Sequence, residues 1–511
     1  MSASDVSTRS LRRLLFYGGA TLGIAVGLER ALGFLSAMLA ARIGGPERFG
    51  AYSVVLATAG TIAAYAGAGI GTTANRFSGQ YRSESPGYRG FLRALMIISL
   101  TSAALAAALM FAGARPLAHW MLGNDGLTSF LRLAALSSAV MVLLECCRGL
   151  LIGQQKYYSL LAISLISGAG LIVVLPLAAR VSPGAMVAGQ GCVALLAVLC
   201  CVAFSRWLGI APSRTETNHH GPGVKPVFAF GLVQFIAVAG ISIASWWIAS
   251  LVARSDSTLT QMGVYAVANQ FRGLAAIAPG LFTQVGYSLL TNETGSAYGG
   301  PNRVMLTNTL LTTSLVVTIA GLAMAVGPWL LLYAYGRSFM AGEAPIMILL
   351  ATGIIHMSGV PAAHRLSITA LRATGIINAI WAILIVLLGV WLVPGAGATG
   401  AAVAFLIAHA AASLLVVGSL ARQRELPGGY LSMFVVSISG AFALVWLGYW
   451  RAVSPTHSYA LTVAILALWS LMLIALWQIG AKLGFQPHSF AGAFQFRKRP
   501  LGLAENDLAH P

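Results

Sequence analysis

One short stretch decides the fold because the chain contains it twice, as Gly50-Ala51-Tyr52-Ser53-Val54 and as Gly263-Val264-Tyr265-Ala266-Val267. Ala41-Arg42 precedes the first copy by seven residues and Ala253-Arg254 precedes the second by eight, each at the joint between two long apolar segments. A second pair, Pro183-Gly184-Ala185 and Pro394-Gly395-Ala396, has nearly the same offset. A repeat of about 210 residues is too long for a solenoid unit, so it predicts a duplicated half-protein. Duplicated halves of membrane proteins usually move against each other around a central site, and the repeat therefore favours a transporter.

The composition is that of a polytopic membrane protein. Of 511 residues, 58% are hydrophobic and 9% are charged. The apolar runs are about 20 residues long, the length that crosses a hydrocarbon core of about 30 Å. The net charge is +18, which we assign to basic cytoplasmic loops rather than to nucleic-acid binding. The cysteines lie in apolar segments without metal-ligand spacing, so we expect no metal and no cofactor.

The apolar runs predict an all-α fold of about 14 transmembrane helices. They form two pseudo-symmetric six-helix bundles, a linker and two additional C-terminal helices. The predicted parts are an N-terminal tail (1–13), a first lobe (14–205), a linker (206–225), a second lobe (226–420), two further helices (421–481) and a C-terminal tail (482–511). With the N-terminus inside, 21 Lys and Arg lie on cytoplasmic segments and 8 on the outer side. This bias predicts that both tails and the linker, including His219-His220, are cytoplasmic.

Ionisable residues within the predicted spans indicate the functional site, because a charge near the bilayer centre is costly unless it has a partner or a wet cavity. Arg30 lies about 17 Å below the outer end of the first span, and Arg272 lies about 17 Å below the outer start of the eighth span, at about 261 to 290. Glu29 is a candidate for ion coupling or for the counter-ion of Arg272. Glu145 is expected to pair with Arg148.

Polar side chains share helix faces with these charges. Tyr265, Asn269 and Arg272 follow one stripe, with spacings of four and three residues. Similar stripes are Gln234, Ser242 and Ser245 on the seventh span, and Thr58, Thr61 and Tyr65 on the second. We therefore expect the first, second, seventh and eighth spans to line one polar cavity. The alternative is that these groups only hold helices together by hydrogen bonds. His356 and His409 are expected to be hydrogen-bonded core residues.

Four segments in order carry a resemblance to a known family: RIGGPERFGAYSV (42–54), QMGVYAVANQF (261–271), YGRSFMAGEAPIMIL (335–349) and PGAGATGAAVA (394–404). They resemble the Wzx-type O-antigen and exopolysaccharide flippases of the multidrug/oligosaccharidyl-lipid/polysaccharide exporter superfamily. The resemblance implies two six-helix lobes in the bacterial inner membrane, which open alternately to the cytoplasm and the periplasm. It implies an undecaprenyl-pyrophosphate-linked oligosaccharide as substrate. It also implies partners such as a polysaccharide polymerase and glycosyltransferases, and it implies no enzymatic activity.

The residue chemistry agrees with an anionic sugar-phosphate ligand. Arg30 and Arg272 offer fixed charged forks for phosphate, while Gln234, Tyr265 and Asn269 suit hydroxyl groups. A cation-coupled drug exporter of the same superfamily remains an alternative, although it would favour carboxylates in the cavity. A membrane polysaccharide polymerase or ligase is another alternative, but the outer connections are short and contain no visible nucleophile or carboxylate pair. A purely structural scaffold would leave the two arginines unexplained.

Overall fold

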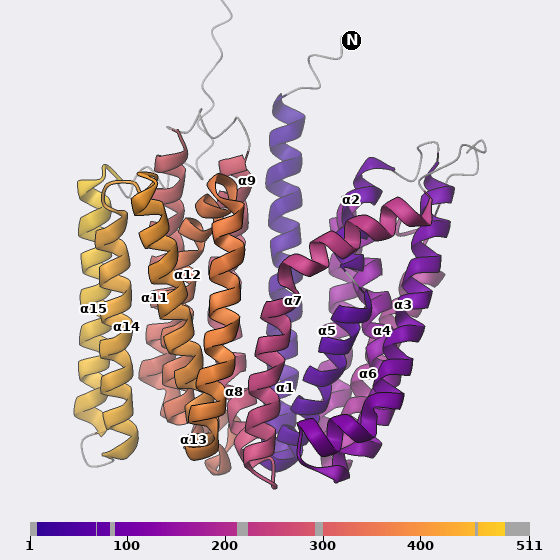
Figure 1. Cartoon of the computed structure of the whole chain (residues 1–511), viewed down its shortest axis with the longest axis horizontal. Coiled ribbons are helices and arrows are strands. Elements are labelled where there is room, and N and C mark those ends of the chain that lie inside the picture. Colours follow the sequence, from indigo (N-terminus) through magenta and orange to yellow (C-terminus); the bar gives the residue numbers. More distant parts are fainter. Residues whose placement is uncertain are drawn as a thin grey trace, which may run out of the picture.

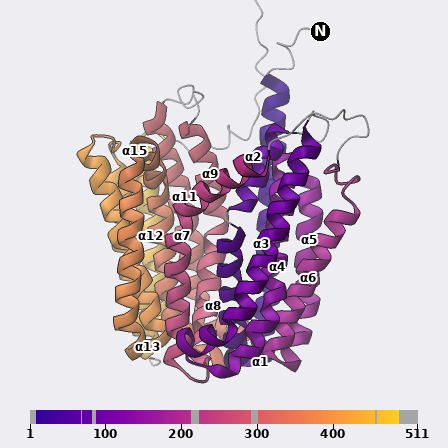
Figure 2. The ribbon, with the colours of Figure 1, turned by 45° about the vertical axis from the view of Figure 1, so that its right-hand side comes forward.

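The computed structural model describes residues 8–67, 69–81, 87–211, 223–291, 300–454 and 458–485. Within these ranges all regular structure is helical (Figures 1 and 2). The first part of the chain contains α1 (Thr8–Gly67), α2 (Ile70–Gln80), α3 (Tyr88–Pro116), η1 (Leu117–Met121), η2 (Asp125–Leu127), α4 (Thr128–Gly153), α5 (Tyr157–Val181) and α6 (Pro183–Ala203). The rest contains α7 (Val224–Ser255), α8 (Thr260–Ala275), α9 (Ile277–Thr291), α11 (Gly300–Leu330), η3 (Leu331–Tyr335), η4 (Arg337–Gly342), α12 (Glu343–Thr369), α13 (Leu371–Arg422), α14 (Tyr430–Val453) and α15 (Ser458–Lys482).

Most of the predicted linker, including His219-His220, lies outside the described residues, as does most of the C-terminal tail. Helix α1 begins at Thr8, within the stretch expected to be the N-terminal tail.

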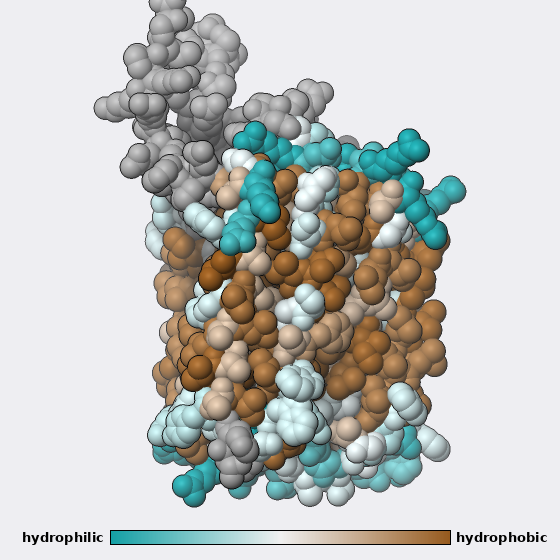
Figure 3. Space-filling model, turned by 90° about the vertical axis from the view of Figure 1, so that its left-hand side faces the viewer, coloured by the Kyte–Doolittle hydropathy of each residue, from teal (hydrophilic) through white to brown (hydrophobic). Residues whose placement is uncertain are grey.

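The protein has the dimensions and surface of a membrane protein. Ten helical stretches among the described residues are long and apolar enough to cross a membrane. Figure 3 shows the corresponding surface, an apolar band with hydrophilic residues gathered above and below it. The number ten is smaller than the predicted fourteen partly because two of the stretches each contain two predicted spans.

These two stretches are α1 and α13, which are both bent at a glycine. In α1 two helical arms meet at Gly45, where φ is +73° and Pro46 follows. In α13 two arms meet at Gly397, where φ is +50°. A positive φ is readily adopted only by glycine, so these residues allow the chain to turn without an intervening loop.

The eighth predicted span is not one helix, contrary to expectation. It is divided at Ala276 into α8 and α9. Pro279 explains the division, because it has no N–H to donate to the carbonyl of Ala275 and its ring is crowded by that carbonyl. The break leaves Arg272 in the last turn of α8.

Local structure recurs at the offset of the sequence repeat. Helix α3 passes into a π-helical turn, a 3₁₀ turn and then α4, and helix α11 passes through the same series into α12. The two π-helical turns begin at Leu117 and Leu331. Positive φ recurs as well, at Gly45 (+73°) and at Leu259 (+62°). The duplication therefore extends to irregular backbone far from the two short motifs.

The hydrophobic core is continuous at one end of the molecule and divided at the other. One cluster joins residues of both parts of the chain, such as Phe49 and Val55 of α1 with Val252 and Val264 of α7 and α8. Two further clusters are separate, one around Tyr88 and Phe91 and the other around Met305, Leu366 and Tyr430. We call the end with the α1 bend and the α7–α8 corner, at the bottom of Figure 1, the closed end. The opposite end is the open end.

Candidate functional site

A cavity of about 660 Å³ lies between the two parts of the chain. It is lined by both arms of α1, by α5 and α6, and by α7, α8 and α13. The first, second, seventh and eighth predicted spans therefore all contribute residues to the lining of this cavity. Among the described residues that line it, Arg272 is the single charged side chain.

Arg272 is held in a fixed orientation. Its Nε and Nη2 both donate to Oδ1 of Asn269, at 3.0 Å and 2.8 Å. The guanidinium lies over the Phe405 ring, 5.0 Å from the centroid, which is an attractive cation–π geometry. None of the described residues accepts a hydrogen bond from Nη1 of Arg272. A guanidinium that is positioned by neutral groups keeps its positive charge for an anionic ligand.

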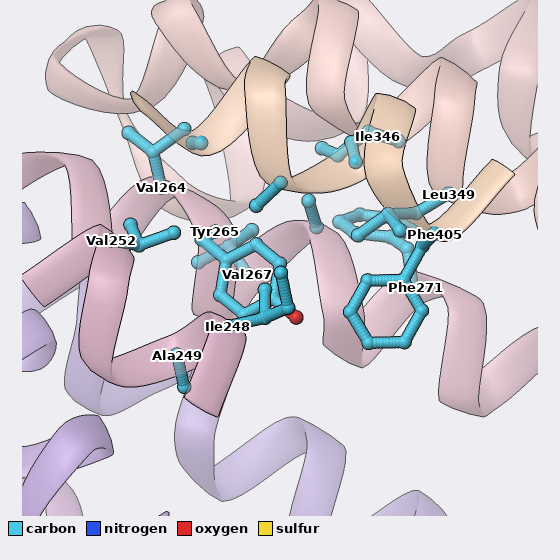
Figure 4. Close-up of a cluster of buried hydrophobic side chains, with 14 of the residues drawn as sticks. Ile248, Ala249, Val252, Val264, Tyr265, Val267, Phe271, Ile346, Leu349 and Phe405 are labelled. Atoms are coloured by element: carbon cyan, nitrogen blue, oxygen red, sulfur yellow. The ribbon is translucent and has the colours of Figure 1, made fainter. Parts of the chain in front are cut away.

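Two tyrosines from the duplicated motif also line this cavity. Tyr52 donates to Oε1 of Gln190 at 3.2 Å, and both residues belong to the lining. Tyr265 is 4% exposed and packs in the cluster shown in Figure 4, where its hydroxyl is the one oxygen drawn among apolar side chains of α7, α8, α12 and α13. Tyr52 and Tyr265 occupy equivalent positions in the two copies of the motif, and each forms part of the cavity lining.

Arg30 does not share this cavity. It is exposed and lines a smaller pocket of about 200 Å³ between α1, α8 and α9. Gly33, Ala37 and Gln270 line both spaces, so the Arg30 pocket adjoins the Arg272 cavity across the seam between α1 and α8. The sequence placed both arginines at one depth, but the side-chain direction separates them.

Glu29 is the partner of Arg148 and not the counter-ion of Arg272. The Arg148 guanidinium forms one ion pair with Glu29 and a second, at 2.9 Å, with Glu145. Ser164 donates to the other carboxylate oxygen of Glu29 at 3.0 Å. The expected Glu145 to Arg148 pair is confirmed. These charged residues line a second cavity of about 610 Å³, which adjoins the first at Gln190 and Ser242.

The predicted hydroxyl stripes divide between the cavity and interhelical bonds. Thr61, Ser242 and Ser245 line the Arg272 cavity. Thr58 instead accepts a bond from Nε1 of Trp246 at 3.0 Å, and Tyr65 donates to the carbonyl of Ala239 at 2.6 Å. The side chain of Gln234 lies outside the described part of the structure.

The two core histidines lie against each other. The rings of His356 and His409 are perpendicular, with centroids 5.0 Å apart, and Nδ1 of His409 is 2.8 Å from the carbonyl of Phe405. The described residues contain no group of three or more His, Cys, Asp or Glu that could hold a metal ion.

Gln190, Trp246 and Phe405 belong to the site but could not be chosen from sequence. Each lies on a long apolar helix without a charged neighbour, and the sequence contains no signal for its direction.

The fold is similar to the folds of solved membrane transporters. The lipid II flippase MurJ in an inward closed conformation superposes with a TM-score of 0.63 and 15% identity, over 91% of this chain and 99% of that chain. An inward-facing multidrug resistance MATE family transporter of the MOP superfamily superposes at 0.59 and 15% identity, over 83% and 98%. A MOP superfamily transporter from Pyrococcus furiosus superposes at 0.51 and 15% identity, over 82% and 98%. The chain thus has the fold that these solved transporters share.

The sequence match identifies a family that is more specific than the fold. Residues 15–287 match the family model described as polysaccharide biosynthesis protein. Because the match covers more than half of the chain, the protein belongs to the polysaccharide biosynthesis protein family. No curated protein matches the chain by sequence.

Proposed function

We propose that the protein is a flippase that moves undecaprenyl-pyrophosphate-linked oligosaccharides from the cytoplasmic to the periplasmic leaflet of the bacterial inner membrane. It works by alternating access of two six-helix lobes, about 14–205 and 226–420, in a chain with fourteen membrane passes and cytoplasmic termini. The observation that carries the proposal is the fixed guanidinium of Arg272 in a cavity whose lining also includes amide and hydroxyl groups. A pyrophosphate needs such a charged fork, and sugar hydroxyls need neutral hydrogen-bonding partners. Family membership supports the same substrate class.

The residues have different proposed roles. Arg272 binds phosphate in the main cavity, while Asn269 fixes its orientation. Arg30 attracts the headgroup from the adjoining pocket and contributes less. Tyr265 and Gln234 are further candidates for contacts with the headgroup.

A cation-coupled drug exporter is the second candidate, because MATE family transporters share the fold. A cationic drug would meet the positive charge of Arg272 in the main cavity. The carboxylates of Glu29 and Glu145 lie in the adjoining cavity, and both are paired with Arg148. The charge distribution therefore favours an anionic substrate.

Deletion of the gene and complementation test the proposal. The deletion strain should lose surface polysaccharide and keep its drug resistance. Arg272→Ala should fail to restore the polysaccharide although normal amounts of protein reach the membrane, and Arg272→Lys should restore it partly because Lys keeps the charge and loses the planar fork. Lost drug resistance with intact polysaccharide would favour the exporter. Normal polysaccharide from a well-expressed Arg30→Ala, Arg272→Ala double variant would remove the assigned role of the arginines.

A further inference from the structure

The two copies of the duplicated motif touch each other at the closed end. Gly50 of α1 lies against the start of α8, so that a Cβ on Gly50 would contact the carbonyl of Leu259 and lie 2.8 Å from the nitrogen of Gly263. A Cβ on Gly263 would contact the carbonyl of Pro46 and lie 2.9 Å from the Cα of Pro46. Pro46 and Leu259 each lie four residues before the glycine of their own copy. The contact is therefore reciprocal, and we call it the glycine crossing.

The backbone turns just before each of the two crossing arms. Gly45 and Leu259, both with positive φ, turn the chain immediately before the two helical arms that cross. Asp256 then fixes the second turn, because its carboxylate accepts bonds from the backbone nitrogens of Thr258 and Gln261, both at 3.0 Å. The φ of Leu259 is +62°, a backbone conformation that residues other than glycine rarely adopt.

Equivalent side chains also anchor each arm to its own part of the fold. Nη1 of Arg48 donates to the carbonyls of Ala179 and Arg180, at 3.4 Å and 3.3 Å. Gln261 lies two residues before Gly263, as Arg48 lies two residues before Gly50. Oε1 of Gln261 accepts a hydrogen bond from the backbone nitrogen of Ala398 at 3.1 Å. Each crossing arm is thus tied to its own half, while the two arms meet backbone to backbone.

The glycine crossing lies directly beside the proposed substrate cavity. Tyr52 and Tyr265, two residues beyond the two glycines, both line that cavity. The hydrophobic core is continuous between the two parts of the chain at this end and separate at the other end. The crossing therefore closes the cavity on one side.

We propose that the glycine crossing is the seal of the closed end, and that Gly50 and Gly263 separate when this end opens in the other half of the transport cycle. Any side chain at either position would collide with backbone, which cannot rotate away as a flexible side chain can. Substitution should therefore destabilise the closed arrangement and shift the population toward the state open at this end. This inference requires alternating access, and it holds whatever the transported molecule is.

Accessibility of a reporter cysteine tests the seal. Ser53→Cys places a thiol in the cavity lining, and a membrane-impermeant maleimide is applied to intact spheroplasts, the side that the closed end faces under the proposed topology. The five native cysteines are controlled by labelling the parent protein. Adding Gly50→Ala or Gly263→Ala should raise the labelling rate about tenfold, because a methyl group inserted into this packed contact destabilises the closed arrangement.

Two exposed glycines of α13 that line none of these cavities are controls. A Cβ at Gly375 or at Gly418 would meet no atom within 4 Å. Gly375→Ala and Gly418→Ala should therefore leave the labelling rate within about twofold of the Ser53→Cys parent. Equal rates for Gly50→Ala, Gly263→Ala and these controls, with similar amounts of protein in the membrane, would overturn the proposal.

A reversible cross-link keeps the test decisive if the glycine variants accumulate poorly. A Cβ on Gly123 would lie 3.7 Å from the Cβ of Arg254, across the two parts of the chain at the closed end. This separation suits a disulfide. Gly123 has a φ of +66°, so a cysteine there is strained, and the reduced form of the variant is the control for that strain. Oxidation of the Gly123→Cys, Arg254→Cys variant should stop polysaccharide export and suppress labelling of Ser53→Cys, and a reductant should restore both. Labelling that continues in the fully cross-linked protein would refute the seal. If the cross-link suppresses labelling but deletion of the gene leaves surface polysaccharide unchanged, the proposed substrate is refuted and the proposed seal is not.

Discussion

Arg451 should fasten the two additional helices to the second part of the fold. It lies in α14, its side chain is 1% exposed, and its Nε donates to Oε1 of Glu343 in α12 at 2.7 Å. Its Nη2 donates to the carbonyl of Met324 in α11 at 2.7 Å. Pro328, four residues after Met324, has no N–H, so the arginine replaces the missing helical donor.

Removal of one member of this buried pair leaves the other without compensation. Breaking a buried ion pair in this way typically costs about 3–5 kcal/mol. For a chain of this size we expect Arg451→Met or Glu343→Gln to lower the melting temperature by about 3–5 °C. The Arg451→Met, Glu343→Gln double variant removes both charges, and its loss should be smaller than the sum of the two single losses.

Thermal unfolding of the purified protein in detergent measures these differences. Arg422→Met, which removes an exposed arginine at the end of α13, is the matched control and should change the melting temperature by less than about 2 °C. Additive losses in the double variant would show that Arg451 and Glu343 do not act as a pair. An unchanged melting temperature in Arg451→Met would refute the buried network as a source of stability.

Three further outcomes are expected. Glu29→Gln should reduce the amount of protein in the membrane because it removes a partner of Arg148. Glu145→Gln should not reduce it, because the Glu145 side chain is 58% exposed. Lost export by Glu29→Gln with normal abundance and retained substrate binding would instead assign ion coupling to Glu29. Asn269→Ala should reduce export about tenfold at normal abundance, as expected when a charged hydrogen bond that orients Arg272 is lost, and unchanged export would contradict that positioning role. Reporter fusions in the linker at 206–225 should be cytoplasmic and fusions at 254–257 periplasmic, and the reverse pattern would overturn the proposed topology.

Much of the fold follows from the sequence because membrane spans and duplications have strong signals. The apolar runs predicted an all-α membrane protein, and the motif around Gly50 and Gly263 predicted that two distant segments have equivalent structure. The sequence did not predict the division at Ala276, although Pro279 supplied a reason for it. It also gave no sign that the two glycines would touch, because an offset along the chain does not determine which helices are neighbours.

The site was less predictable than the fold. Helical spacing correctly placed Tyr265, Asn269 and Arg272 on one face that lines the cavity. Spacing fixes only the direction around a single helix axis, so it could not show that Arg30 faces a separate pocket. For the same reason it could not show that Glu29 pairs with Arg148, which lies more than a hundred residues away.

The most direct measurement of the central claim is lipid translocation by the purified protein in liposomes. The substrate is an undecaprenyl-pyrophosphate-linked oligosaccharide placed in one leaflet, and its appearance in the other leaflet is followed by the accessibility of the sugar to an added glycosidase. We expect rapid translocation with the wild-type protein, none above the protein-free rate with Arg272→Ala, and a wild-type rate with Gly418→Ala. Translocation by Arg272→Ala at the wild-type rate would contradict the role of the guanidinium, and equal rates for protein-free and wild-type liposomes would contradict the proposed function itself.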